Sequence, residues 1–287
     1  WRFVSSSGNP IVASNGLQLQ THKLEPRERY DLVFIPSLHY GGQGQFDQIL
    51  DRLADTSDWL VAQWRAGAWI AANCTGTFIL AQTGLLDGRT VTTTWWLERQ
   101  FRAKYPKVDL QIRSVITESD RLVCAGASAS YLLQAIRIIE RFSGPAIASQ
   151  TAKSLLIDVS QTSQVPYLPL LAERAHSDSL VERAQHWLQS NMTKELRISV
   201  LADALAISDR TLIRRFKAAL GQTPLAYLQD LRLEAARALL ETGDLSVEAI
   251  GGQVGYNDTS SFSRLFRQRI GMSPGAYRNR FQINSAP

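Results

Sequence analysis

Residues 216–227 read FKAALGQTPLAY, and residues 266–277 read FRQRIGMSPGAY. The two stretches share Phe, a basic residue, Gly, Thr or Ser, Pro, Ala and Tyr in register, at a constant offset of 50 residues. Upstream, LADALAIS from Leu201 corresponds to IGGQVGYN from Ile250 at an offset of 49. Because only two copies are present, and solenoids need about three or more, the chain contains a duplicated supersecondary unit.

Each copy is predicted to be two short helices joined by a tight turn, which is a helix-turn-helix. Apolar residues recur at helical spacing, and the turns fall at Ala206-Ile207 and Gly255-Tyr256, where a small residue avoids a clash at the crossing. The second helix of each copy has an N-cap, a terminating Gly and a following Thr-Pro or Ser-Pro that starts the next helix: Ser208, Gly221 and Thr223-Pro224, then Asn257 or Asp258, Gly271 and Ser273-Pro274.

A longer helix is predicted between the two copies, over residues 225–241. Its apolar stripe consists of Leu228, Leu231, Ala235 and Leu239, as expected of a helix that holds both units. About 17 residues span roughly 25 Å at 1.5 Å per residue. That length suits two reading heads near the roughly 34 Å repeat of one duplex turn.

Residues 196–281 closely resemble the AraC/XylS-type DNA-binding domain along its whole length, in RTLIRRF, GQTPLAYLQDLRLEAARALL and VGYNDTSSFSRLFRQRIGMSPGAYR. One departure is Gly251-Gly252, where the family usually has Ala first. Each glycine costs about 1 kcal/mol of helix propensity relative to Ala, so we expect a locally looser second unit. The resemblance implies a transcription regulator that binds a double-stranded DNA operator, contacts RNA polymerase and works as a homodimer.

Recognition helices present their outward, N-terminal positions to the major groove, and Arg can grip guanine bidentately. The residues predicted to contact bases are Arg210, Thr211 and Arg214 in the first unit, and Thr259, Ser260, Ser263 and Arg264 in the second. The residues predicted to contact phosphates are Arg215, Lys217, Arg267 and Arg269. The alternative is an ordinary solvated basic face, but paired basic residues on two turn-linked helices favour DNA.

Charge and composition agree with this interpretation without deciding it. The net charge is +5, with fourteen Lys and Arg against ten Asp and Glu in 179–287, but seventeen against sixteen in 1–178.

The 287 residues fit two domains. Two cysteines are too few for a disulfide framework and lie in no metal-ligand spacing, and neither a leader nor a stretch of about 18 apolar residues is present. We therefore expect a cytoplasmic protein with no membrane association, metal or cofactor.

Residues 1–160 alternate short apolar strands with amphipathic segments around 47–65, 76–86 and 129–142. The predicted strands are RFVSS, DLVFIP, WIAAN, TVTTT and RLVCAG, which indicates a flavodoxin-like α/β fold with a parallel sheet. At Asn73-Cys74-Thr75-Gly76 a buried strand turns sharply into the helix TFILAQTGLL. Cys74 would therefore project at the carboxyl edge of the sheet, where α/β proteins bind ligands.

The run GAWIAANCTGTFILAQTGLLDGRTVTTTWW resembles the ThiJ/PfpI, class I glutamine amidotransferase-like domain found in front of many AraC-type domains, over about residues 1–158. In enzymes of that superfamily a nearby His and an acid activate the elbow cysteine. Here no histidine is near Cys74 in sequence, Thr94 stands where the regulators often carry His, and only His39 could approach Cys74 through the fold. We expect a pocket-lining thiol and no enzymatic activity.

The predicted effector pocket consists of Ser37, Leu38, His39, Cys74, Thr75, Gly76, Trp95 and Trp96. The alternative for Trp95 and Trp96 is a role as core or dimer-contact aromatics. The expected organisation is a sensor domain over 1–158, a linker over 159–178 and a DNA-binding domain over 179–287. The resemblance also implies a first strand and helix that this sequence lacks, through truncation, disorder or replacement by another segment.

The sequence thus predicts a ligand-responsive transcription regulator, with activation or repression left open. One alternative is a cysteine amidase or hydrolase of the ThiJ/PfpI type with an incidental DNA-binding domain, which would require a base near Cys74. Another is a non-specific nucleoid binder, which would bind all duplexes with equal affinity.

Overall fold

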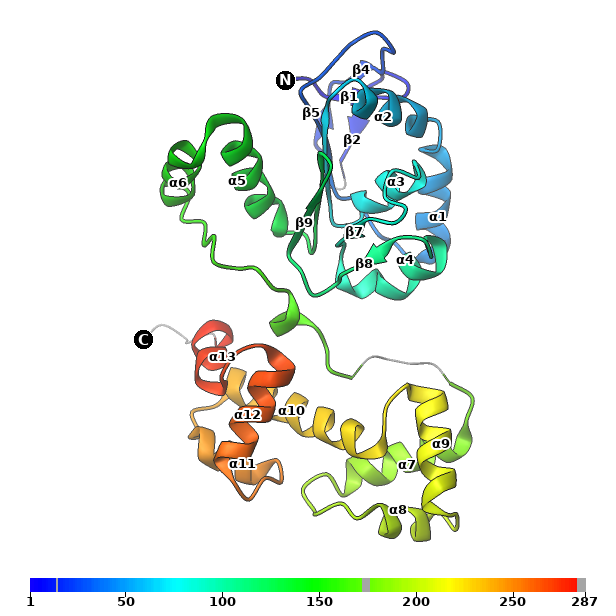
Figure 1. Ribbon diagram of the computed structural model, residues 1–287, viewed down its shortest axis with the longest axis vertical. Coiled ribbons are helices and arrows are strands. Elements are labelled where there is room, and N and C mark those ends of the chain that lie inside the picture. Colours follow the sequence, from blue (N-terminus) through cyan, green and yellow to red (C-terminus); the bar gives the residue numbers. More distant parts are fainter. Residues whose placement is uncertain (14, 172–175, 283–287) are drawn as a thin grey trace. The chain divides into compact units, whose positions relative to one another are not determined.

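The computed structural model describes residues 1–13, 15–171 and 176–282. The chain divides into two compact units, Trp1–Gln164 and Val165–Pro287 (Figure 1). The first is an α/β unit and the second is helical, as the sequence predicts.

The first unit is built on a four-stranded sheet of order β5-β6-β10-β9. Three strands, β5 (Leu32–Ile35), β6 (Trp69–Asn73) and β10 (Leu122–Ala125), are parallel, and β9 (Ile116–Ser119) runs antiparallel to β10. Strands β6 and β10 are almost entirely buried, because helices cover both faces of the sheet. The predicted α/β fold with a mostly parallel sheet is confirmed.

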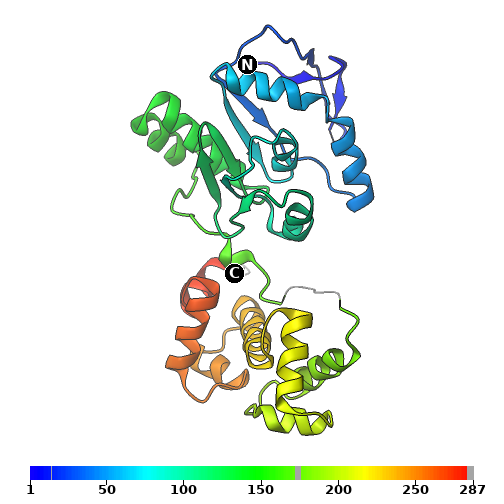
Figure 2. The same ribbon diagram turned by 45° about the vertical axis from the view of Figure 1, so that its right-hand side comes forward.

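Helices lie on both sides of this sheet (Figures 1 and 2). Those on one side are α1 (Gln43–Arg52), α2 (Thr56–Arg65), α3 (Gly76–Gln82) and α4 (Glu98–Lys104). Those on the other are α5 (Ser130–Ser143) and α6 (Pro145–Ser154). The sequence analysis did not anticipate α4, α6 or the antiparallel strand β9.

Two of the predicted strands do not join the main sheet. Within RFVSS, β1 (Val4–Ser5) pairs with β4 (His22–Lys23), and within TVTTT, β7 (Thr90–Val91) pairs with β8 (Asp109–Leu110). A further pair is β2 (Ile11–Val12) with β3 (Gln18–Leu19). The threonines that follow β7 bond to other segments: Thr92 Oγ1 donates to Ser114 O (2.8 Å), and Thr93 Oγ1 donates to Cys74 O (2.7 Å).

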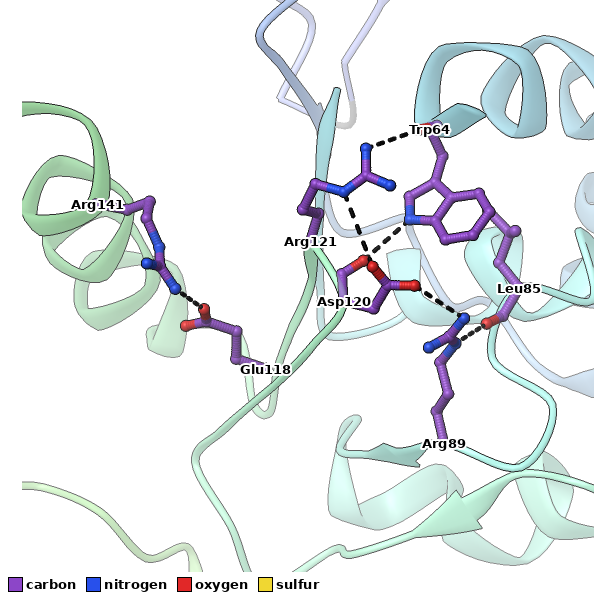
Figure 3. A network of polar contacts seen from close by, with 7 residues as sticks. All are labelled: Trp64, Leu85, Arg89, Glu118, Asp120, Arg121 and Arg141. Carbon is purple, nitrogen blue, oxygen red and sulfur yellow. Dashed lines mark hydrogen bonds and ion pairs between the residues drawn. The ribbon is translucent and has the colours of Figure 1, made fainter. Parts of the chain in front are cut away.

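The antiparallel edge is made by a tight hairpin between β9 and β10, at Asp120-Arg121. Both residues have positive φ, 46° and 63°, as a two-residue type I′ turn requires. Trp64 at the end of α2 anchors the turn, because its indole N–H donates to Asp120 O and its own carbonyl accepts from Arg121, each at 2.9 Å (Figure 3). Arg89 also pairs with Asp120, at 3.2 Å. The β9-β10 hairpin is thus held by Trp64 of α2 and by Arg89 just before β7.

The second unit contains two helix-turn-helix units joined by one long helix. The first pairs α8 (Ile198–Ala204) with α9 (Asp209–Leu220), and the second pairs α11 (Val247–Gln253) with α12 (Thr259–Ile270). Helix α10 (Pro224–Thr242) connects them, α7 (Ser179–Ser190) precedes the first unit, and α13 (Pro274–Phe281) follows the second (Figures 1 and 2).

The predicted caps are confirmed, and Asp258 is the N-cap of α12. Its side chain accepts from the backbone N–H groups of Ser260 and Ser261, and Ser208 accepts from Thr211 N at the start of α9. Gly221 and Gly271 end α9 and α12 in the left-handed conformation. Thr223 and Ser273 cap the helices that begin with Pro224 and Pro274.

Each helix-turn-helix unit has its own hydrophobic core. Leu201, Leu212 and Phe216 lie in the first core, and Ile250, Phe262 and Phe266 lie in the second. The two cores share α10, whose beginning contributes Tyr227 and Leu228 to the first, and whose later residues Leu233, Ala236 and Leu240 belong to the second.

The four residues of the predicted apolar stripe of α10 all pack on the two cores. Leu228 and Leu231 contact the first core, and Ala235 and Leu239 contact the second. Of the four only Leu228 is fully buried, while the other three are half-buried, because the helix turns different faces to two cores at its two ends.

The segment predicted as a linker, 159–178, is packed over part of its length. Ser163 bridges to Ser114 in the first unit, and Gln164 is buried there. After it, Arg237 on α10 donates to Pro166 O (2.9 Å) and Leu168 O (2.8 Å). Residues 172–175 lie outside the described residues, and the linker boundaries stay a prediction.

Candidate nucleic-acid interface

Helix α9 has one buried and one exposed face. Leu212, Phe216 and Leu220 are buried in the first core. On the other face, four exposed side chains follow one another at i, i+3, i+4 and i+7: Arg210, Ile213, Arg214 and Lys217. With Ala218 they line a shallow hollow in the surface. The structure thus brings two predicted base contacts and one predicted phosphate contact onto one face, which we call the α9 face.

Ile213 lies on the α9 face and was missed by the sequence analysis. Its side chain is 38% exposed, although isoleucine is usually among the most buried residue types. The signal was present in the sequence, because Ile213 is three residues after Arg210 and four before Lys217 on a predicted helix. Apolar side chains at such positions contact the methyl group of thymine.

Helix α12 presents the matching surface fifty residues later. The equivalents of the four residues of the α9 face are Ser260, Ser263, Arg264 and Arg267, which we call the α12 face. Ser260, Arg264 and Arg267 are exposed, and Ser263 is half-buried. The first residue of the helix, Thr259, is also half-buried, as is Thr211 in the first unit, whose hydroxyl lies 2.9 Å from the Ser208 hydroxyl.

Two of the residues predicted to contact phosphate are engaged within the protein. Arg215 forms a bidentate salt bridge with Asp178, in which Nε and Nη2 donate to the two carboxylate oxygens at 2.8 Å and 2.6 Å. The hydrogen bond from Arg215 lowers the pKa of Asp178, which also caps α7. Arg269 Nε lies 3.8 Å from the buried carboxylate of Asp230. Contact of all four with phosphate stays a prediction, and the geometry favours the exposed Lys217 and Arg267.

In the α/β unit, residues 1–164, Cys74 lies at a sharp elbow between β6 and α3. Its φ is 54°, a left-handed value that non-glycine residues rarely adopt, and its side chain is 2% exposed. The elbow needs glycine at position 76, because a Cβ there would lie 2.6 Å from Pro36 O. The Sγ atom lies 3.9 Å from Ser128 Oγ. The predicted turn is confirmed, together with the placement of Cys74 at the carboxyl edge of β6.

Several of the predicted effector-pocket residues lie around this elbow. Ser37 Oγ donates to Asn73 Oδ1 (2.6 Å), Leu38 N donates to Thr75 Oγ1 (2.7 Å), and Thr75 Oγ1 donates to Leu38 O (2.9 Å). His39 follows on the exposed side of the loop. Among the hydrogen bonds of the described residues, none joins His39 to Cys74.

Trp95 and Trp96 form an edge-to-face pair with ring centroids 5.3 Å apart, at the short 3₁₀ helix Trp95–Leu97. Trp96 is 45% exposed and Trp95 is half-buried, so neither is a core residue. Their role in a pocket or in a dimer contact stays a prediction.

A cavity lies elsewhere in the α/β unit, between α5, α6, β9 and residues 156–162. Its volume is about 790 Å³, and its apolar lining includes Leu133, Ile136, Ala148 and Ile157. The sequence analysis did not predict it, because its walls come from segments brought together only by the packing of α6 against α5.

Among residues 1–13, 15–171 and 176–282, no group of three or more His, Cys, Asp or Glu side chains is placed to hold a metal ion. No helix among those residues has the length and apolar character needed to cross a membrane.

Comparison with known protein families matches both units. Residues 201–280 match the profile of a helix-turn-helix domain, and residues 2–139 match that of the DJ-1/PfpI family. The chain joins a DJ-1/PfpI domain to an AraC-type helix-turn-helix domain. The resemblances stated from the sequence are confirmed.

Relatives of this two-domain chain are transcriptional regulators. The HTH-type transcriptional regulator CdhR of Pseudomonas aeruginosa is 29% identical over 276 residues, covering 96% of this chain and 80% of that protein. The HTH-type transcriptional regulator ArgR of the same species is 29% identical over 224 residues, covering 77% and 68%. Among solved structures, the DNA-binding domain of AdpA in complex with a target DNA is 32% identical, covering 35% of this chain and 91% of that chain with a TM-score of 0.34.

Proposed function

We propose that this protein regulates transcription by reading an operator with α9 and α12 in successive major grooves. The observation that carries the proposal is the matched pair of outward faces, the α9 face and the α12 face, on duplicated helices with N-caps. Each helix buries its apolar side in its own core, so its polar and basic side chains are held in fixed directions.

The side chains on these faces have different proposed roles. Arg210, Arg214 and Arg264 are long, exposed donors suited to guanine. Hydroxyl groups that donate to or accept from base edges are those of Thr211, Thr259, Ser260 and Ser263. Ile213 contacts a thymine methyl, and Lys217 and Arg267 contact phosphate.

The DJ-1/PfpI domain is proposed to bind a small-molecule effector at the elbow. The pocket would use Ser37, Leu38, His39, Cys74, Thr75, Gly76, Trp95 and Trp96. A ligand with different affinities for two arrangements of the protein shifts the balance between them, and so alters operator binding. The proposed assembly is a homodimer that contacts RNA polymerase.

The DJ-1/PfpI family includes enzymes, so a hydrolase with Cys74 as nucleophile is the second candidate. The strained elbow favours it, because strained backbone is often found at active sites, although the Cys74 side chain is only 2% exposed. The neighbour of the Cys74 thiol is the Ser128 hydroxyl at 3.9 Å, which is not a base. We therefore propose a binding role for Cys74. A covalent adduct with a mild electrophile, formed much faster than at a free thiol and lost in Cys74→Ser, would favour the enzyme instead.

The decisive experiment is selection of binding sites from a random duplex library at about 0.15 M salt, where a sequence-specific protein enriches a motif above the electrostatic background. We expect two short conserved blocks about one helical turn apart. Arg264→Ala should relax preference at one base and weaken specific binding by about 1–3 kcal/mol. Arg183→Ala, which removes an exposed arginine of α7, is the matched control. The absence of an enriched motif, with the protein folded, would refute the proposal.

A further inference from the structure

One side chain of α10, that of Arg232, contacts both halves of the helical unit. Its Nε donates to Met192 O and its Nη2 donates to Lys194 O, each at 2.7 Å. Both acceptors belong to the loop between α7 and α8, which packs on the core of the first helix-turn-helix unit through Met192. The guanidinium also lies 5.2 Å from the ring centre of Tyr256, in the turn of the second unit. A single half-buried arginine thus binds both units at once.

The backbones of the two units also approach closely at this junction. Gly255, in the turn of the second unit, has φ 93°, and a Cβ there would lie 2.9 Å from Cα and O of Thr193 and 3.0 Å from Arg232 Nη2. Because the neighbour is mostly backbone, rotation of a side chain cannot relieve such a contact. The loop Met192–Lys194 and the turn Gly255-Tyr256 therefore have one well-defined distance from each other.

A second polar contact holds the recognition helix of the second unit against α10. Asp230 lies two residues before Arg232, is 3% exposed, and faces Arg269 on α12 with Nε at 3.8 Å. In addition, Leu170 packs on the second core and the adjoining Leu171 packs on the first. The junction thus combines several contacts, but Arg232 has hydrogen bonds and a ring contact that span it.

We propose that Arg232 sets the spacing between the two DNA-reading helices, so that operator recognition depends on the number of base pairs between the half-sites. Arg232 is a positioning residue, since it acts through α9 and α12 and is not itself on the α9 face or the α12 face. This inference rests on the proposed function, and it adds that spacing is read by the protein as well as base sequence.

Arginine suits this position for a geometric reason. Its planar fork serves two carbonyl groups while its flat face stacks on an aromatic ring, whereas the ammonium of lysine is a point charge with no face. In Arg232→Ala, two carbonyls lose their donor and the space beside Tyr256 opens. The α10 backbone remains, so each unit keeps its own core while the angle between the units is less restrained.

The test measures affinity against half-site spacing. The full chain and its Arg232→Ala, Arg232→Lys and Tyr256→Leu variants are titrated with the selected operator, and with duplexes that have one or two base pairs inserted or removed between the conserved blocks. Each base pair shifts one half-site by about 3.4 Å and roughly 34–36°. Arg183→Ala is the control, because it removes an exposed arginine that is not among the residues that Arg232 contacts.

For the unaltered chain we expect one inserted base pair to lower affinity by about 100-fold. The insertion displaces one recognition helix from its half-site, and each bidentate base contact that it loses contributes about 10–100-fold in affinity. Arg232→Ala should bind the original duplex with about tenfold lower affinity, because a more mobile junction must be ordered on binding. One inserted base pair should lower its affinity only about tenfold more, because the mobile junction tolerates other spacings. Arg232→Lys should resemble Arg232→Ala, and Tyr256→Leu should broaden the spacing profile while keeping an apolar side chain in the turn.

A uniform loss of affinity at all spacings, in both Arg232→Ala and Tyr256→Leu, would show a merely structural role and overturn the inference. Hydrogen exchange in α11 and α12 distinguishes a variant that has lost its second core from one with a loosened junction. If the unaltered chain enriches no motif at all, the proposed function fails. If the unaltered chain enriches a motif, but an inserted base pair lowers its affinity no more than that of Arg232→Ala, only the spacing inference fails.

Discussion

We expect Gly252→Ala to stabilise the second helix-turn-helix unit. Gly252 is exposed in the last turn of α11 (Val247–Gln253), and a Cβ added there would meet nothing within 4 Å. The new methyl group therefore causes no clash and buries no polar atom. It restricts the unfolded chain, where glycine has more freedom than alanine, and this difference is worth about 0.5–1 kcal/mol in a helix.

Hydrogen exchange of the full chain measures this effect locally, since it does not require both domains to unfold together. At about 1 kcal/mol, the amides of α11 and α12 that exchange through opening of this unit should do so about five times more slowly. Amides of the DJ-1/PfpI domain provide the internal control. Unchanged or faster exchange in α11 and α12 would refute the reasoning.

Gly255→Ala, three residues later, should have the opposite effect. The positive φ of Gly255 costs an L-residue about 1–2 kcal/mol, and the clash with the backbone of Thr193 adds to that cost. The two substitutions add the same methyl group to the same short segment. If both changed exchange in the same direction, local propensity alone would not explain either result.

Three further predictions test the electrostatics and the DNA-facing surface. Replacing the thymine nearest Ile213 in the selected operator by uracil should weaken binding by about fourfold, the value of one buried methyl group; Ile213→Ala should bind both duplexes equally, and an equal loss in both proteins would contradict the contact. Burial raises the pKa of Asp230 to about 6, against the opposing effect of Arg269, so the folded state binds this proton more tightly than the unfolded state. The contribution of Asp230 to stability therefore increases as the pH falls from about 7 to about 4, and urea unfolding of Asp230→Asn should lack that contribution; identical pH profiles would exclude it. Lys217→Ala should weaken binding to all duplexes alike and reduce the slope of log affinity against log salt concentration by about one. Arg215→Ala should leave that slope unchanged, because Asp178 holds the guanidinium of Arg215. A slope reduced in both variants would indicate that Arg215 contacts phosphate.

Local signals in the sequence were sufficient for the elements and their ends. The helix-turn-helix units follow from caps and apolar spacings in which each residue acts on neighbours three or four positions away, as Ser208 does on Thr211. The elbow at Cys74 follows from a buried apolar strand that runs directly into Thr75-Gly76. Such interactions depend on a few consecutive residues, so they can be predicted without knowing the fold.

Only the tertiary structure decided which exposed charges face outward and which hold the protein together. Arg215 and Lys217 look alike in the sequence, but Arg215 pairs with Asp178, which is 37 residues away. Arg232 lies on the predicted linker helix, and the sequence does not indicate its acceptors, which lie 38 and 40 residues earlier. The division of α10 between two cores and the cavity beside α5 and α6 also arise from packing between distant segments. The sequence determined where each helix forms, because that is governed by local hydrogen bonds and periodicity. The partners of its polar side chains were decided by which distant groups the fold brings within hydrogen-bonding distance.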